Sequence, residues 1–330
     1  MTPSKQMSRH EIGPRFSVVI AVYNGDDYIE RAVESALNQT YPPYEVIIVD
    51  DGSTDRTAEK MRRYAEMIQY FYQDNEGVSV ARNVGSNLAQ GDWLAFLDAD
   101  DWYYPDRLKL HAEFIAECPN LDFLVGDFDY VGIDGKIVRG SMESTPIGSK
   151  LIHKSSGSDR VLMEGEELGD FVEQQFSDLR TLSVRRKTFC EVGGFPRYFQ
   201  ICEDVHLLIR LCAISQRVGV ICKPMAAYFV HDEGLVRSDI IRSQQETVKA
   251  LLSLRKDIFN ASPWVRRGWK RALRRARLDF AYALLRSSDR SKAVRAVFPL
   301  LFEMPGVHSL RDISSIVRGF QRPGERPSTQ

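Results

Sequence analysis

The first hundred residues alternate between short apolar runs and segments whose apolar residues recur at helical spacing. The runs are rich in Val and Ile, which is typical of strands buried on both faces of a parallel sheet. We predict strands over 16–23, 44–49, 70–72 and 93–97. We predict helices from Asp26, as a capping residue, to Tyr41, over 57–68 and over 77–90. Such alternation with short connections indicates an α/β fold with a doubly wound, mostly parallel sheet flanked by helices.

The pattern is less regular after residue 101. It predicts further strands over 122–131, 181–184, 218–221 and 226–231, and a hairpin turn at 132–135. It predicts helices over 105–116, 186–191, 203–211, 243–259, 263–285 and 291–302. The Ser-, Gly- and Lys-rich stretch 141–157 is expected to be a loop, and the chain from Gly306 onward to be loosely ordered.

Carboxylates follow two of the predicted strands directly. Asp98, Asp100 and Asp101 come after the strand 93–97, and Asp50 and Asp51 come after the strand 44–49. The carboxyl ends of parallel strands meet at one edge of a sheet, where ligands bind. Gathering this much negative charge is costly unless a cation neutralises it, and oxygen ligands suit Mg²⁺ or Mn²⁺. The Asp-x-Asp pair therefore indicates a metal–diphosphate site, with an acidic, solvated loop as the alternative.

Several other classes of protein are disfavoured. The first strand is followed by neither a Gly-x-Gly-x-x-Gly nor a Walker motif, which argues against dinucleotide and P-loop enzymes. Five cysteines without Cys-x-x-Cys spacing indicate reduced intracellular thiols. Since there is no apolar run of roughly 20 residues and no signal-peptide pattern, we expect a cytoplasmic protein.

The net charge of −1 conceals an uneven distribution. From Ala261 onward there are 15 Lys and Arg against 5 Asp and Glu, whereas the preceding part holds 29 against 40. The segment 263–285 carries seven of these 15 cations, together with Trp264 and Trp269. One interpretation is peripheral contact with an anionic membrane, on its inner face. The other is a helical cap on the catalytic part with solvated arginines, and nucleic acid is not expected.

Four ordered motifs, at 16–25, 49–55, 80–83 and 91–102, closely resemble the family-2 glycosyltransferases of the GT-A fold. The resemblance continues through 193–195, 203–204 and 228–231 and covers roughly residues 15–235. It implies an inverting enzyme that uses a nucleotide-diphospho-sugar, here a UDP-sugar by expectation, and a divalent ion. The acceptor would be a hydroxyl of a glycan or lipid-linked molecule in surface polysaccharide or glycoconjugate synthesis.

The resemblance also implies roles for individual residues. Ala21, Tyr23, Asp51 and Arg82 would face the nucleotide, with Tyr23 beside the base ring and Asp51 accepting a hydrogen bond from the base. Asp98 and Asp100 would be the Asp-x-Asp pair, Asp100 being the direct metal ligand, and His231 would approach the metal or diphosphate. The alternatives that do not depend on the family are a core position for Tyr23, a helix-face salt bridge for Arg82 and a structural role for His231.

The Glu203-Asp204 pair is expected in the first turn of a helix, where acidic residues also act as plain helix stabilisers. The family places its general base in this motif, and we assign Asp204, with Glu203 as the alternative. The family usually has an arginine where this chain has Phe229, so part of the diphosphate clamp is expected elsewhere, for instance at Arg237.

These expectations divide the chain into a disordered lead over 1–14, a catalytic domain over 15–238 and a helical extension over 239–330. Within the catalytic domain, 15–101 would bind the nucleotide and 102–238 the acceptor. Two rivals stay open. A non-catalytic nucleotide-sugar-binding protein would lack a usable base, and a sugar nucleotidyltransferase would need a Gly-rich, cationic loop after the first strand, which this chain does not have.

Overall fold

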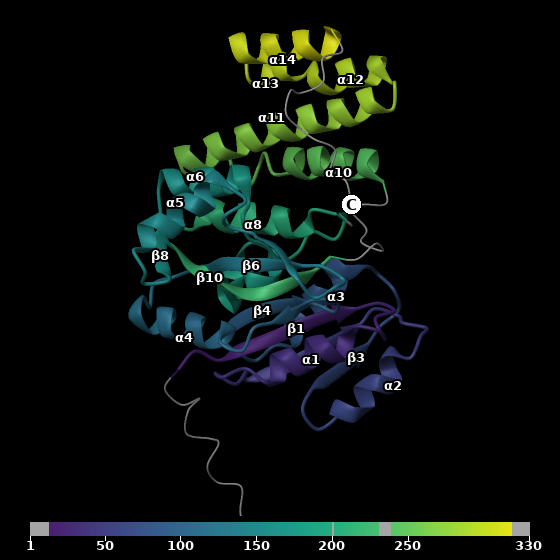
Figure 1. Cartoon of the computed structure of the whole chain (residues 1–330), viewed down its shortest axis with the longest axis vertical. Coiled ribbons are helices and arrows are strands. Elements are labelled where there is room, and N and C mark those ends of the chain that lie inside the picture. The colour runs from purple at the N-terminus through teal and green to yellow at the C-terminus, as the bar shows by residue number, and fades with distance from the viewer. Residues whose placement is uncertain (1–12, 200, 231–238, 319–330) are drawn as a thin grey trace, which may run out of the picture.

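The computed structural model describes residues 13–199, 201–230 and 239–318. A mixed sheet forms the centre of the molecule, helices cover its two faces, and the C-terminal helices stack at the end opposite α2 (Figure 1). Within the described residues the sheet has ten strands. Its main order is β3-β2-β1-β4-β9-β6-β10-β5, with β7 paired to β6 and β8 paired to β10.

The first half of the sheet is parallel, as the sequence predicts. It contains β1 (Phe16–Val22), β2 (Glu45–Asp50), β3 (Gln69–Tyr72) and β4 (Trp93–Asp98). Every residue of β1 is buried, because helices cover both faces. These helices are α1 (Ile29–Leu37), α2 (Thr57–Met61), which continues as a 3₁₀ turn over Arg62–Tyr64, and α3 (Val78–Leu88).

Two details near these helices differ from the predictions. Asp26 does not cap α1, which begins after Tyr28 without a side-chain cap; the Asp26 carboxylate instead pairs with Arg56 at 3.2 Å. The regular α-helical part of α2 ends at Met61 rather than at residue 68.

The second half of the sheet is mixed. It contains β5 (Trp102–Tyr103), β6 (Phe123–Val131), β7 (Ile137–Gly140), β8 (Arg160–Met163), β9 (Ser183–Arg185) and β10 (Val218–Phe229). β9 lies antiparallel between β4 and β6, and β10 runs parallel to β6 with two register shifts. The predicted 132–135 turn does join a hairpin, since β6 and β7 pair antiparallel. The helices of this half are α4 (Arg107–Glu117), α5 (Pro146–Ser155), α6 (Glu166–Gln174), α7 (Arg186–Glu191) and α8 (Glu203–Ile214).

Helix α5 corrects the expectation of a loop over 141–157. Thr145 caps the helix by accepting a hydrogen bond from the Gly148 amide at 3.1 Å, and Pro146 occupies the first turn. Ile147 and Leu151, one turn apart, are buried. The polar composition of the stretch concealed this short apolar spacing.

The C-terminal helices are α10 (Ile240–Ser253), α11 (Pro263–Arg286), α12 (Arg290–Val297), α13 (Leu300–Glu303) and α14 (Val307–Arg318). The existence of α14 contradicts the expectation of loose order from Gly306. Its Ile316 is fully buried in a small core with residues of α11, α12 and α13, and that burial offsets the entropy of ordering the helix. No helix within the described ranges is long and apolar enough to cross a bilayer.

Helix α11 packs against α6 with backbone in contact. A methyl group on Gly268 would lie 2.0 Å from the carbonyl oxygen of Gly169, so only glycine fits there. Trp269 donates its indole N–H to the Leu251 carbonyl at 2.8 Å, and Arg271 pairs with Asp170 at 2.6 Å. The glycine contact and the Arg271–Asp170 pair join α11 to α6 of the sheet domain, whereas the Trp269 bond joins α11 to α10. The predicted boundary between residues 238 and 239 stays a prediction, because 231–238 lie outside the described residues.

Candidate active site

Three parallel strand ends meet at one edge of the sheet, which we call the acidic edge. In the register of β1 with its neighbours, Ala21 lies opposite Asp98 and Val22 lies opposite Asp50. Asp51 follows Asp50, and its backbone amide donates to the Val22 carbonyl at 2.8 Å. The strand pattern therefore brings Ala21, Asp51 and Asp98 together, as predicted from the topology.

Arg82 of α3 connects this edge to the helix that carries the Glu203-Asp204 pair. Its side chain is only 6% exposed, and it donates to Asp98 Oδ1 at 2.5 Å and to Glu203 Oε1 at 2.7 Å. Burial alone would raise the pKa of Asp98, but Arg82 and Arg180 outweigh that effect and lower it. For Glu203 the burial prevails over Arg82 and raises the pKa.

Arg180 is a second buried guanidinium at the acidic edge, and the sequence analysis did not identify it. It donates from Nε to Asp101 at 2.6 Å, pairs with Asp178, and lies 3.9 Å from Asp98. Its guanidinium also lies over the ring of Tyr228, 4.4 Å from the centroid. The residue lies in a 3₁₀ turn just before β9, where no local pattern distinguishes a buried arginine from an exposed one.

Asp100 and Asp101 differ in their exposure to solvent and in their hydrogen-bond partners. Asp101 is fully buried, accepts the Phe229 amide at 2.9 Å and has a raised pKa because of burial, with Arg180 opposing the rise. Asp100 is partly exposed, and its backbone carbonyl accepts from Arg31 at 2.7 Å. Of the two carboxylates, Asp100 is the one accessible to a ligand.

Arg31 of α1 lies next to Phe229, the position at which the family usually has an arginine. Its guanidinium lies over two neighbouring aromatic rings, 3.9 Å from the centroid of Trp102 and 4.7 Å from that of Phe229. The position at which the family carries an arginine is thus filled by Phe229, which packs on an arginine from α1. Arg237, the substitute suggested from the sequence, lies outside the described residues.

The nucleotide-facing candidates lie at the ends of β1 and β2. The Asp51 carboxylate accepts from Gln73 Nε2 at 2.7 Å, the Glu76 amide at 2.9 Å and the Gly77 amide at 2.8 Å. It therefore fixes the loop that precedes α3. Tyr23 is 55% exposed at the end of β1, so the interpretation of this residue as core is wrong.

The two candidate bases differ in their environment. Glu203 is held by Arg82, whereas Asp204 accepts one bond, from the Val205 amide to Oδ1 at 2.7 Å. Within the described residues Asp204 Oδ2 accepts no hydrogen bond. Asp178, which the sequence analysis missed, faces the same space: burial raises its pKa to about 6, Arg180 opposes this rise, and Asp204 adds to it.

A hard divalent ion suits the charge of this edge. Asp98, Asp100, Asp101, Asp178 and Asp204 gather around two buried arginines, so negative charge is in excess. No group of three or more His, Cys, Asp or Glu in the described parts of the chain is arranged to hold a metal. Asp98 and Asp100 would therefore supply only part of a ligand shell, and His231 lies outside the described residues.

Comparisons with known proteins identify the class to which this α/β fold and its acidic edge belong. The family model for glycosyl transferase family 2 matches residues 17–175. The putative teichuronic acid biosynthesis glycosyltransferase TuaG of Bacillus subtilis is 34% identical over 195 residues, which is 54% of this chain and 75% of TuaG. The chain belongs to glycosyl transferase family 2.

Other curated relatives are matched over a smaller share of their length. An uncharacterized glycosyltransferase of Rickettsia typhi is 37% identical over 119 residues, 36% of this chain and 37% of the relative. The chain spans between 18% and 37% of the length of the first five curated relatives that it matches.

Solved structures share the fold at low identity. S. aureus TarS 1-349 in complex with UDP-GlcNAc superposes with a TM-score of 0.60 and 19% identity, covering 92% of this chain and 89% of that one. The mannosyltransferase PcManGT from Pyrobaculum calidifontis, in complex with GDP-Man and Mn²⁺, superposes with a TM-score of 0.60 and 19% identity, covering 92% and 79%. The predicted GT-A fold with added C-terminal helices is confirmed.

Proposed function

We propose that the protein is an inverting, metal-dependent glycosyltransferase that moves a sugar from a nucleotide-diphospho-sugar to a hydroxyl group. The observation that carries the proposal is the bridge from Asp98 through Arg82 to Glu203. It joins the edge of the sheet where a diphosphate would lie to the first turn of α8. A donor bound at this edge would thereby lie close to a proton acceptor in the first turn of α8.

For the donor we propose a UDP-sugar, with Ala21, Tyr23, Asp51 and Arg82 around the nucleotide. An exposed aromatic ring beside a buried carboxylate suits a base with an N–H to donate. S. aureus TarS in complex with UDP-GlcNAc supports this choice, and PcManGT in complex with GDP-Man keeps a GDP-sugar as the alternative.

We propose that Asp98, Asp100 and His231 hold Mn²⁺ or Mg²⁺. When bound, the ion would neutralise charge on the leaving diphosphate. The chain's own contribution is electrostatic as well, since Arg82 and Arg180 are fixed beside the same carboxylates before any donor binds. Fixed cations of this kind need no rearrangement as the leaving group becomes charged.

Asp204 would act as the general base. As the acceptor oxygen bonds to the anomeric carbon, its proton would pass to the Asp204 carboxylate while the bond from that carbon to the diphosphate oxygen breaks. Asp204 Oδ2 accepts no hydrogen bond from the residues that the structure describes, which supports this role and argues against the non-catalytic alternative. Arg82 would hold Glu203 as a positioning residue rather than the base.

The acceptor we propose is a glycan or lipid-linked molecule of surface polysaccharide synthesis. Support comes from TuaG, whose name refers to teichuronic acid biosynthesis. Membership of a glycosyltransferase family argues against the nucleotidyltransferase alternative.

Calorimetry with UDP-, GDP- and dTDP-sugars, with and without Mn²⁺, tests the proposal. We expect one nucleotide class to bind, more tightly with Mn²⁺, and the corresponding diphosphate to be released when acceptor is supplied. If no nucleotide sugar binds in either condition, the donor assignment is wrong. If a sugar 1-phosphate and a nucleoside triphosphate are joined instead, the nucleotidyltransferase alternative holds.

A further inference from the structure

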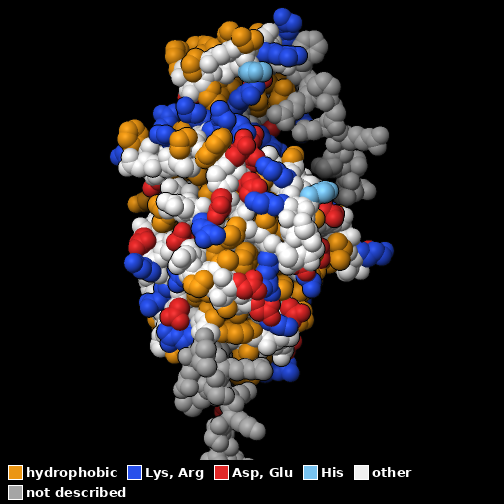
Figure 2. Space-filling view, turned by 90° about the vertical axis from the view of Figure 1, so that its left-hand side faces the viewer, with side chains coloured by type: hydrophobic (Ala, Val, Ile, Leu, Met, Phe, Trp, Pro, Cys, Tyr) orange, Lys and Arg blue, Asp and Glu red, His pale blue; other side chains and the backbone are white. Residues whose placement is uncertain are grey.

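The C-terminal helices carry an exposed surface of cations and aromatic rings on the side of the molecule seen in Figure 2. Lys and Arg side chains gather there at the level of α11, with hydrophobic side chains above them. We call this surface the cationic–aromatic face and define it by six exposed residues: Lys256, Phe259, Arg266, Lys270, Phe298 and Phe302.

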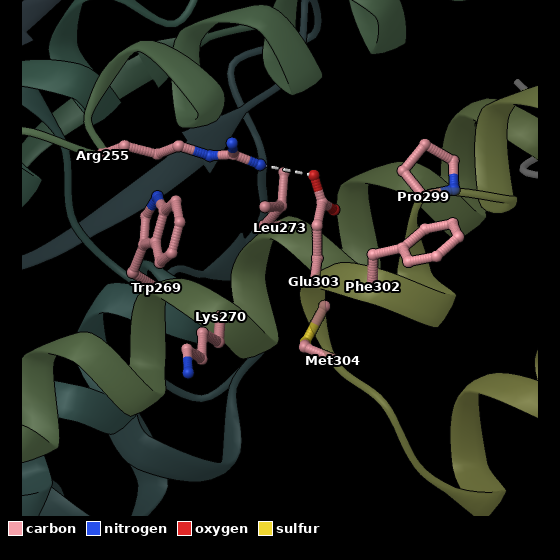
Figure 3. A pocket seen from close by; sticks show the side chains of 8 residues that line it. All are labelled: Arg255, Trp269, Lys270, Leu273, Pro299, Phe302, Glu303 and Met304. Carbon is pink, nitrogen blue, oxygen red and sulfur yellow. Dashed lines mark hydrogen bonds and ion pairs between the residues drawn. The ribbon is translucent and has the colours of Figure 1, made fainter.

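Several contacts place these residues on one surface. Arg266 donates to the Phe259 carbonyl at 3.3 Å, and the rings of Phe298 and Phe302 meet at 5.9 Å between centroids. Lys270 and Phe302 line a common cavity of about 460 Å³. In Figure 3, Lys270 comes from α11 and Phe302 from α13, on opposite sides of that cavity.

The walls of the cavity are mostly apolar. They include Trp269, Leu273 and Met304, with an Arg255–Glu303 pair at 2.6 Å across one side. Apolar walls with a cationic rim suit an amphiphile, whose chain would enter the cavity while its anionic group meets Lys270.

Most of the other arginines of α11 have structural partners. Arg271 pairs with Asp170, Arg274 with Asp312 and Arg277 with Glu303, each at 2.6–2.7 Å. The segment 263–285 therefore acts partly as the predicted helical cap. By contrast, Lys256 and Lys270 make no ion pair or side-chain hydrogen bond with other described residues, so their charge is available to a partner.

We propose that the cationic–aromatic face docks on a lipid bilayer that contains anionic headgroups. Phe259 is 74% exposed and Phe302 is 76% exposed, and rings at this level of exposure beside lysines are suited to the headgroup boundary. Val307 and Leu310 of α14, the helix that follows Phe302 along the chain, are exposed as well, and they favour lipid over nucleic acid, because aliphatic side chains make no favourable contact with a phosphate backbone. The inference is independent of the donor and the chemistry proposed above.

Flotation of the full chain with phosphatidylcholine vesicles, with and without phosphatidylglycerol, tests this docking. We expect binding only to the anionic vesicles, and weaker binding at high salt. In Lys256→Ala/Lys270→Ala each lost cation should weaken binding about fivefold. Phe302→Ser should weaken it further, since one inserted ring is lost.

A matched control is Lys136→Ala/Lys187→Ala, which removes two exposed lysines from the catalytic part and should bind vesicles as the wild type does. Should the double variant of the face fail to fold, Lys270→Glu changes a single exposed side chain and should still weaken binding. Equal affinity for neutral and anionic vesicles, an unchanged Lys270→Glu, or loss of binding in the control would overturn the proposal. A short RNA that outcompetes the vesicles at equal salt would identify a nucleic-acid surface instead. No nucleotide sugar is present in the assay, so its result is separate from that of the donor experiment.

Discussion

Arg82 and Glu203 lie 121 positions apart in the sequence and are joined in the fold by a buried hydrogen bond of 2.7 Å. The bond fixes the first turn of α8 against α3. It also pairs Glu203 with a buried cation, whereas among the described residues the Asp204 carboxylate accepts a hydrogen bond only from the Val205 backbone amide. This difference favours Asp204 over Glu203 as the proposed general base.

Asp204→Asn should lower the transfer rate by at least about 10²-fold and leave donor affinity close to that of the wild type. The substitution keeps the shape of the side chain and the bond to the Val205 amide, but it removes the proton acceptor. Steady-state transfer and calorimetric donor titration, measured on the same preparation, check both parts.

Glu203→Gln is the matched comparison. Its amide oxygen still accepts from Arg82, so we expect a smaller loss of rate than for Asp204→Asn, accompanied by reduced stability because a buried charge pair is removed. A larger loss of rate in Glu203→Gln would make Glu203 the base, and negligible effects in both variants would place the base outside this pair.

Asp100→Ala should remove most of the gain in donor affinity that Mn²⁺ provides, by at least about tenfold. Because the side chain is partly exposed, the free energy of unfolding should stay near that of the wild type. Donor titrations in Mn²⁺ and in EDTA measure the gain. Asp134→Ala, at the exposed turn before β7, is the control that should change neither quantity. An undiminished Mn²⁺ effect in Asp100→Ala would refute the metal-site assignment.

His206 should make stability depend on pH. Burial, assisted by Arg210, lowers the pKa of His206 to about 4 in the folded protein, below its ordinary value of 6.5. Between these values the unfolded chain binds the extra proton, so stability is fully present above pH 6.5 and is lost as the pH falls toward 4. The loss is on the order of 3 kcal/mol.

His206→Gln removes this titration while it keeps an acceptor for Arg210 and a donor for Ser253. Urea unfolding across the range should show the variant losing less stability than the wild type as the pH is lowered. Parallel pH profiles for the two proteins would show that His206 is not the titrating group.

Gly268→Ala should destabilise the protein by about 1–3 kcal/mol or more, because the added methyl would overlap the Gly169 carbonyl. The intrinsic helix preference for alanine works in the opposite direction, by about 1 kcal/mol. Arg267→Ala, at the exposed neighbouring position, is the control and should stay within about 0.5 kcal/mol of the wild type. A Gly268→Ala variant as stable as this control would show that α6 and α11 can separate.

The strands of the first half could be predicted because Val18, Ile20 and their neighbours form continuous apolar runs, which depend on local sequence alone. Their shared edge followed from topology, so Asp98 and Asp51 were predicted as site residues before any geometry was known. The family pattern supplied Arg82 and Asp204, whose roles stay predictions.

Arg180 could not be predicted in the same way. Its burial depends on Asp101, which is 79 positions away in the sequence, and on the ring of Tyr228 from another strand. Helix α14 was missed for a related reason, because its Ile316 becomes a core residue only when α11 and α12 supply the rest of the core. A short window of sequence does not show that a charge will be neutralised, or that an apolar side chain will be buried, by residues far away in the chain.

The backbone contact between Gly169 and Gly268 means that the C-terminal helices cannot serve as a loose tether. A bilayer seated on Phe302 and Lys270 would hold the acidic edge at one constant height above the lipid surface. The proposed transfer would then select acceptors by the distance of their hydroxyl group from the lipid surface, because only a hydroxyl at that height would reach the acidic edge.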